Sequence, residues 1–117
     1  MDNIDWGHLL FSFDGRINRA KFWLGVAVVY VAVWLLAILA VSMNSAFMWM
    51  VLGLVSLATI WPMLAIQIKR WHDRGKSGWW VLIGFIPLIG GIWVLVECGF
   101  LEGTIGNNEY GPNPLEA

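Results

Sequence analysis

The sequence contains a run of 47 residues between Lys21 and Lys69 without a single Asp, Glu, Lys, Arg or His. A second run without these residue types, 77–96, is 20 residues long. In a soluble fold of only 117 residues most of the chain contacts water, so this amount of apolar sequence could not be buried. Charged residues make up 13% of the chain, against about 25% in typical soluble domains. We therefore predict an integral membrane protein, and disfavour a soluble enzyme, a nucleic-acid-binding protein and a disordered chain.

Three apolar segments are candidates for transmembrane helices. A bilayer core of about 30 Å requires about 20 residues in a helix that rises 1.5 Å per residue. We predict an all-α polytopic membrane protein that forms one membrane domain over residues 1–117. Its spans lie at about 22–41, 47–68 and 79–96, and a tail, 97–117, follows the third. The few polar residues after the first span form a tight turn into the second.

Two prolines interrupt the later spans. Pro62 lies in the second and Pro87 in the third, and each removes a backbone hydrogen bond, so we predict a kink in both helices. The third segment is the shortest and also contains Gly90 and Gly91, so a re-entrant segment is the alternative to a full span. Residues 1–13 mix apolar and acidic side chains, and we expect a short helix there in the membrane interface.

All seven basic residues lie in two short segments on either side of the first two spans, namely Arg16, Arg19 and Lys21, then Lys69, Arg70, Arg74 and Lys76. By the positive-inside rule both segments are cytoplasmic, which places the N-terminus in the cytoplasm and, after three spans, the C-terminus in the periplasm. The short turn makes the first two helices antiparallel neighbours, so the two segments should approach one another. Asp14 and Asp73 are the available counter-charges.

We interpret these bases first as topology signals. The alternative is a contact with the phosphates of anionic phospholipid headgroups, to which each base near the membrane contributes about 1 kcal/mol. The candidates for this contact are Arg16, Arg19, Lys21, Arg70, Arg74 and Lys76. The second helix is expected to continue through Arg74 and to end at Gly75, the usual residue after a helix C-terminus.

The residue types that carry catalysis or bind metals are sparse. His72 and Asp73 are adjacent, and neighbouring helical residues point about 100° apart, so they do not form a catalytic pair. One cysteine, Cys98, and two distant histidines do not supply a zinc site. Glu97 at the end of the third span could serve a proton or ion path. We predict no enzyme activity, no cofactor and no metal.

Three aromatic residues are candidates for protein contacts. Trp34 and Trp61 lie deeper than the interfacial belts where tryptophan is usual, so we expect them to pack between helices. Tyr110 is surrounded by glycine and proline in the tail. We therefore expect residues 104–114 to form an ordered loop that is anchored by Tyr110 at the outer ends of the helices.

Three sequence blocks resemble a known family. Residues 13–23 (FDGRINRAKFW) resemble an F-x-G-R-x-x-R-x-x-[FY]-W motif, and residues 70–79 (RWHDRGKSGW) an R-x-H-D-x-x-x-S-G-W motif. The tail resembles a G-T-x-G-x-N-x-Y-G-x-x-P motif. The chain is thereby similar, from about Phe13 to Pro114, to the domain of unknown function 805 family of small bacterial inner-membrane proteins. Trp71, where relatives often have leucine, is a minor departure. The resemblance implies a multi-pass inner-membrane protein and brings no known reaction or ligand.

The nine tryptophans exceed what two interfacial belts require, which favours contacts between proteins. We predict a non-catalytic accessory or stabilising subunit, or a scaffold, that associates with other membrane protein subunits or with itself. The alternatives are an oligomeric transporter or channel component and an enzyme that acts on lipid headgroups at the cytoplasmic face.

Overall fold

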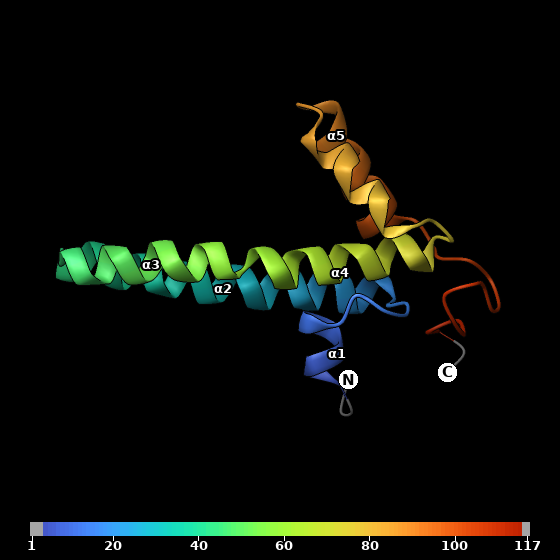
Figure 1. The fold of residues 1–117 in the computed structure, drawn as a ribbon, viewed down its shortest axis with the longest axis horizontal. Coiled ribbons are helices and arrows are strands. Elements are labelled where there is room, and N and C mark those ends of the chain that lie inside the picture. Colours follow the sequence, from blue (N-terminus) through green and yellow to red (C-terminus); the bar gives the residue numbers. More distant parts are fainter. Residues whose placement is uncertain (1–3, 116–117) are drawn as a thin grey trace.

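Two antiparallel helices form the long axis of the molecule (Figure 1). In this computed structural model, which describes residues 4–115, the first is α2 (Arg19–Met43) and the second is α3 (Ala46–Ala58) followed by α4 (Ile60–Asp73). α2 has 25 residues and Ala46–Asp73 has 28, and both are apolar enough to cross a membrane. They extend about 37 and 42 Å, which exceeds the bilayer core of about 30 Å. The first two predicted spans are therefore confirmed as apolar helices of spanning length.

Capping residues set the ends of these helices. The side chain of Asn18 caps α2, and Asn44, in the left-handed region with a φ of 45°, ends it. Ser45 then caps α3, so the predicted tight turn is present. At the other end α4 stops at Asp73, and Gly75 has the φ of 78° that favours glycine after a helix. The predicted end of the second helix is thus confirmed to within a residue.

α3 gives way to α4 at Thr59, three residues before Pro62. Pro62 has no backbone N–H, so it cannot donate to the carbonyl oxygen four residues earlier. The amide of Met63 donates to the carbonyl of Thr59 at 3.0 Å, and the helix resumes. α3 and α4 follow the same direction in Figure 1, and a kink at Pro62 stays a prediction.

The third apolar segment folds into a hairpin, not into a third straight helix. The 3₁₀ helix η1 (Gly78–Phe85) leads away from α4, and α5 (Ile89–Val94) with the π-helix η2 (Leu95–Phe100) leads back. Pro87 holds Ile86 in an extended conformation, and Leu88 with a φ of 64° reverses the chain. The segment 79–96 therefore starts and finishes at one end of the long helices, which corresponds to the re-entrant alternative. Pro87 lies in a turn and kinks no helix.

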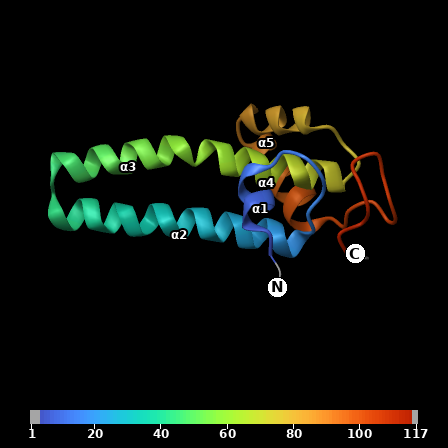
Figure 2. The same cartoon turned by 60° about the horizontal axis from the view of Figure 1, so that its bottom comes forward.

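The N-terminal segment and the tail lie at the same end as the base of the hairpin (Figure 2). α1 (Trp6–Phe11) packs against α4 and leaves Trp6 and Phe11 exposed. The predicted position of the tail, at the end opposite to the N-terminal segment, is wrong, because the hairpin returns the chain to its starting end. Within residues 4–115 there is no β-strand, so the all-α class is confirmed. Residues 1–3 of the predicted interfacial segment lie outside the described residues.

The buried core lies where α1, α2, α4 and η2 meet, near this shared end. Its members are Leu9, Ile17, Phe22, Val29, Ile66, Trp71 and Cys98. The far halves of α2 and α3 contribute almost no buried residue. The buried core therefore lies beside the charged residues.

Candidate functional site

The carboxylate of Asp73 lies between two arginines at the end of the long helices that carries Arg16 and residues 69–76, called here the charged end. Oδ1 of Asp73 accepts a hydrogen bond from Nε of Arg16 at 3.0 Å, and Oδ2 pairs with Arg70. The side chains of Arg16, Arg70 and Asp73 are only 1%, 0% and 4% exposed. Arg70 and Asp73 are one turn apart on α4, and Gly15, with a φ of 91°, directs Arg16 toward them. The two basic segments converge as predicted, with Asp73 as their shared counter-charge.

The backbone of the tail completes the surroundings of Arg16. The Arg16 guanidinium donates hydrogen bonds to three tail carbonyl oxygens, those of Thr104 at 2.7 Å, Gly106 at 2.9 Å and Gly111 at 3.1 Å. The amide of Thr104 donates to the carbonyl oxygen of Asp73 at 2.6 Å. A Cβ on Gly103 would collide with the Asp73 carboxylate, so only glycine fits there. One arginine thus holds the tail and the end of α4 together.

Arg70 holds the returning limb of the hairpin in the same way. Its guanidinium donates to the carbonyl oxygens of Cys98 at 2.6 Å and Leu101 at 2.7 Å. The last carbonyl oxygens of a helix have no donor within the helix, and here the buried arginine is the hydrogen-bond donor. The end of η2 is therefore fixed against α4.

A second charged group lies beside the first. Glu97, on η2, accepts hydrogen bonds from Nε of Arg74 at 2.8 Å and from Nζ of Lys76 at 2.6 Å. Burial alone would raise the pKa of Glu97, but these hydrogen bonds and the two positive charges outweigh it and hold the pKa below the ordinary 4.5. Nζ of Lys76 also lies 4.8 Å from the ring centroid of Trp80. Sequence reasoning missed these pairs because a full third span would have placed Glu97 at the opposite end.

Lys69 on α4 binds the end of the N-terminal helix α1. Its side chain is fully buried, and Nζ donates to the carbonyl oxygens at the end of α1, those of His8, Leu9 and Ser12. A cation at a helix C-terminus is favoured by the helix dipole and by the unpartnered carbonyls. No spacing in the sequence pointed to this contact, because α1 is short and lies far from Lys69 along the chain.

His72 and Tyr110 join α4 to the tail. Their rings are stacked with centroids 3.9 Å apart and planes 3° apart. The Asn108 side-chain amide donates to the carbonyl oxygen of His72 at 2.9 Å, and a ring nitrogen of His72 lies 3.0 Å from the carbonyl oxygen of Gly15. The tail thus contacts α4 through Tyr110, at the charged end and not at the predicted outer ends of the helices.

The Tyr110→Ala substitution should loosen the tail without unfolding the protein. A stacked aromatic pair is worth about 0.5–1.5 kcal/mol, which corresponds to an open tail about two- to tenfold more populated. Limited proteolysis in detergent should show faster cleavage within 105–110, while the long helices stay intact. Rapid cleavage of the unmodified protein at these sites would contradict a docked tail.

The six bases predicted to contact headgroup phosphates occupy different surroundings. Arg16 and Arg70 are buried and bonded within the protein, and Arg74 and Lys76 are paired with Glu97. Arg19 is exposed and donates to the carbonyl oxygen of Phe100 at 2.8 Å, and Lys21 is half-buried. Contact with phosphate therefore stays a prediction, for which Arg19 and Lys21 are the best placed.

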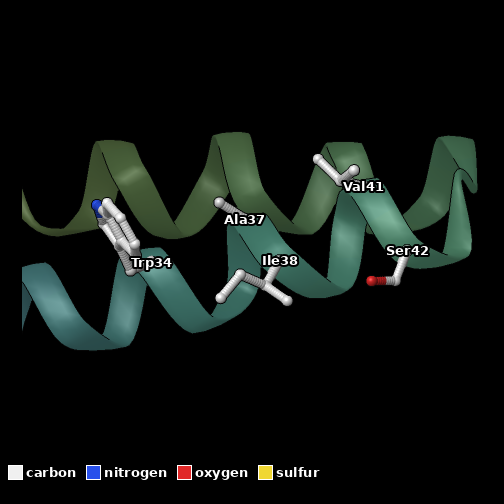
Figure 3. Close-up of a pocket in the computed structure, with 5 residues that line it drawn as sticks. All are labelled: Trp34, Ala37, Ile38, Val41 and Ser42. Carbon is white, nitrogen blue, oxygen red and sulfur yellow. The ribbon is translucent and has the colours of Figure 1, made fainter.

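The two deep tryptophans do not pack between the spanning helices. Trp34 is 69% exposed and lines a shallow groove on α2 with Ala37, Ile38, Val41 and Ser42 (Figure 3). Trp61 donates its ring N–H to the carbonyl oxygen of Phe11 at 2.9 Å and stacks on Phe13. The expectation of interhelical packing is wrong for both, because Trp61 reaches the N-terminal segment and Trp34 faces outward.

Residues 4–115 contain no group of three or more His, Cys, Asp or Glu side chains arranged to hold a metal ion. The charged groups that do converge are paired with one another. Together they form a network of hydrogen bonds and ion pairs that connects α1, α4, η2 and the tail.

Comparison with known proteins identifies the family. The model of the family described as "Protein of unknown function (DUF805)" matches residues 10–112. The chain belongs to the DUF805 family. In Escherichia coli K12, the inner membrane protein YhaI is 33% identical over 104 residues, which cover 88% of this chain and 86% of YhaI. The uncharacterized protein YiiR is 32% identical over 126 residues (87% and 85%), and the inner membrane protein YhaH is 30% identical over 111 residues (88% and 87%).

No solved structure matches this DUF805 chain significantly. The names of two relatives and the two long apolar helices together support an inner-membrane protein. The resemblance found in the three sequence blocks is confirmed. The function of the family is unknown, so function has to be argued from the geometry.

Proposed function

We propose that this DUF805 protein is a non-catalytic accessory subunit or scaffold of the inner membrane, which acts through helix contacts within the bilayer. The observation that carries the proposal is the outward face of α2 around Trp34. Trp34 lies about 22 Å along the helix from Arg19 and about 13 Å from Met43, so it is deep in any bilayer that α2 crosses. Tryptophan prefers the membrane interface, where its ring N–H finds water.

A neighbouring helix would supply what lipid cannot at this depth. Hydrocarbon offers no acceptor to the Trp34 N–H, whereas polar side chains of a second protein do. Ala37 beside Trp34 is small and permits close approach of another backbone. Along the same helix further large apolar side chains are exposed, namely Tyr30, Val31, Leu35, Ile38 and Val41.

The charged end favours a structural role over a catalytic one. Arg16, Arg70 and Asp73 are buried and engaged with each other and with backbone carbonyls. A buried and fully bonded network has no group available to bind and transform a substrate. Both basic segments lie at this end, so the positive-inside rule supports a cytoplasmic orientation for it.

Site-directed photocrosslinking tests the association. With a photoreactive phenylalanine derivative at Ile38, native membranes should yield one protein adduct of defined mass, either a dimer or a heterologous pair. Trp34→Leu should reduce the adduct severalfold, because a flat ring with a polar atom is lost. Phe47→Leu, which changes a similarly exposed aromatic residue (63%) on α3, should leave the yield unchanged. Only lipid adducts at Ile38, or equal effects of the two substitutions, would overturn the proposal.

A further inference from the structure

The hairpin of η1, α5 and η2 starts and finishes at the charged end. At its base the Glu97 carboxylate binds Lys76 at 2.6 Å and Arg74 at 2.8 Å, so the two limbs are fastened to the end of α4. The limbs also pack tightly, since a Cβ on Gly90 would collide with the carbonyl oxygen of Ile83. The hairpin is thus a single element with one charged base and one distant tip (Figure 1).

The surface of this hairpin is apolar on both limbs. No charged residue occurs within 77–96. At the tip Phe85 is 80% and Leu88 79% exposed. Large apolar side chains are also exposed along η1 and along α5, namely Trp79, Leu82, Ile89, Ile92 and Trp93. A partner protein would cover only part of this apolar surface, whereas lipid hydrocarbon would cover the exposed side chains of both limbs.

The hairpin is too short to cross a membrane. Its longer limb, Ile89–Phe100, has 12 residues and extends about 18 Å, little more than half of the bilayer core of about 30 Å. This length suits insertion into one leaflet. The adjoining α2 is about 37 Å long and is sufficient for a full span.

The backbone at the tip is compatible with a hydrocarbon environment, where unpaired N–H groups are costly. The amides of Ile86, Ile89 and Gly90 each donate to a carbonyl oxygen of the tip, at 3.1, 2.7 and 2.9 Å. Pro87 has no N–H to satisfy. The reversal therefore exposes few unpaired polar groups despite its irregular conformation.

We propose that the hairpin is a re-entrant element whose uncharged part, 78–96, inserts into the hydrocarbon of the leaflet adjoining the charged end, while Glu97 stays at its base. Lipid acyl chains surround it there, and the chain crosses the bilayer twice. The N-terminal segment and the tail consequently lie on the same side of the membrane. This inference is independent of the association proposed for α2.

Spin labelling of single-cysteine variants tests the depth of the tip. In a Cys98→Ala background reconstituted in phosphatidylethanolamine–phosphatidylglycerol vesicles, a nitroxide is placed by Leu88→Cys. Leu54→Cys on α3 and Leu115→Cys in the tail are matched controls, because both leucines are 59% exposed. For each label the measured quantity is the ratio of its collision rate with oxygen to its collision rate with a water-soluble nickel complex. This ratio should be severalfold higher for the labels at Leu88 and Leu54 than for the label at Leu115.

Labelling from each side of the membrane tests the topology. In intact spheroplasts and in inverted vesicles, a membrane-impermeant maleimide should label Asp14→Cys and Leu115→Cys in the same preparation. Labelling in opposite preparations would establish a third span and overturn the proposal. A Leu88 label that is accessible to the nickel complex would mean that the tip lies in water, and would overturn the proposal. A Leu88 label that is excluded from oxygen and whose spectrum is broadened by a neighbouring nitroxide would mean that a second copy covers the tip, and would also overturn it.

Discussion

Asp73→Asn should destabilise the protein by about 3–5 kcal/mol, because it leaves two buried arginines without their counter-charge. The asparagine side chain has nearly the same shape as aspartate and still accepts hydrogen bonds, so the change isolates the charge. Arg16 and Arg70 are almost completely buried and cannot turn to water without separating the tail and η2 from α4. The loss should therefore spread across the charged end.

Unfolding in detergent, followed by helical circular dichroism, measures this effect. Asp14→Asn is the control, since it removes an exposed carboxylate of the same charge and should change the free energy of unfolding by less than about 0.5 kcal/mol. Repeating the measurement with added anionic lipid separates two sources of counter-charge. Stability of Asp73→Asn equal to that of the unmodified protein without lipid would show that the arginines do not depend on Asp73. Full restoration by the lipid would show that phosphates can balance them.

The parts of the fold that follow from local rules could be predicted from the sequence. The length of uncharged sequence predicts α2 and α3–α4, and the few polar residues around Asn44 predict the turn between them. That turn makes the helices antiparallel, which brings Arg16 to Asp73 although 57 positions separate them. Each step depends on helix length and a short connection, which are properties of neighbouring residues.

Hydropathy could not decide between a full span and the re-entrant alternative for the hairpin segment, because it counts apolar residues without giving their direction. The reversal depends on Leu88 adopting a positive φ and on Gly90 packing against the opposite limb. Leucine rarely has a positive φ, so the sequence carries no turn signal at that position. A full span over this segment would carry the tail and Glu97 to the opposite end. For that reason the sequence predicts neither the tail carbonyl oxygens that Arg16 binds nor Glu97 as the partner of Arg74 and Lys76.

Arg16→Gln should release the tail from the charged end. Arg16 donates three hydrogen bonds to the tail carbonyls and one to the Asp73 carboxylate. A hydrogen bond to a charged group contributes about 1.5–3 kcal/mol, so the loss of even one should increase the open population of the tail about ten- to a hundredfold. Glutamine is shorter and neutral, and it cannot reach all of these acceptors.

Limited proteolysis within 105–110 detects the open tail, since cleavage follows its population when opening is fast. Arg19→Gln is the control, because Arg19 has the same charge but is exposed and donates to the carbonyl of Phe100. Combining Arg16→Gln with Asp73→Asn should destabilise the fold less than the sum of the two, since each removes the same ion pair. Additive effects would mean that the Arg16–Asp73 pair does not contribute to stability, and equal cleavage rates for Arg16→Gln and Arg19→Gln would mean that Arg16 does not join the tail to α4.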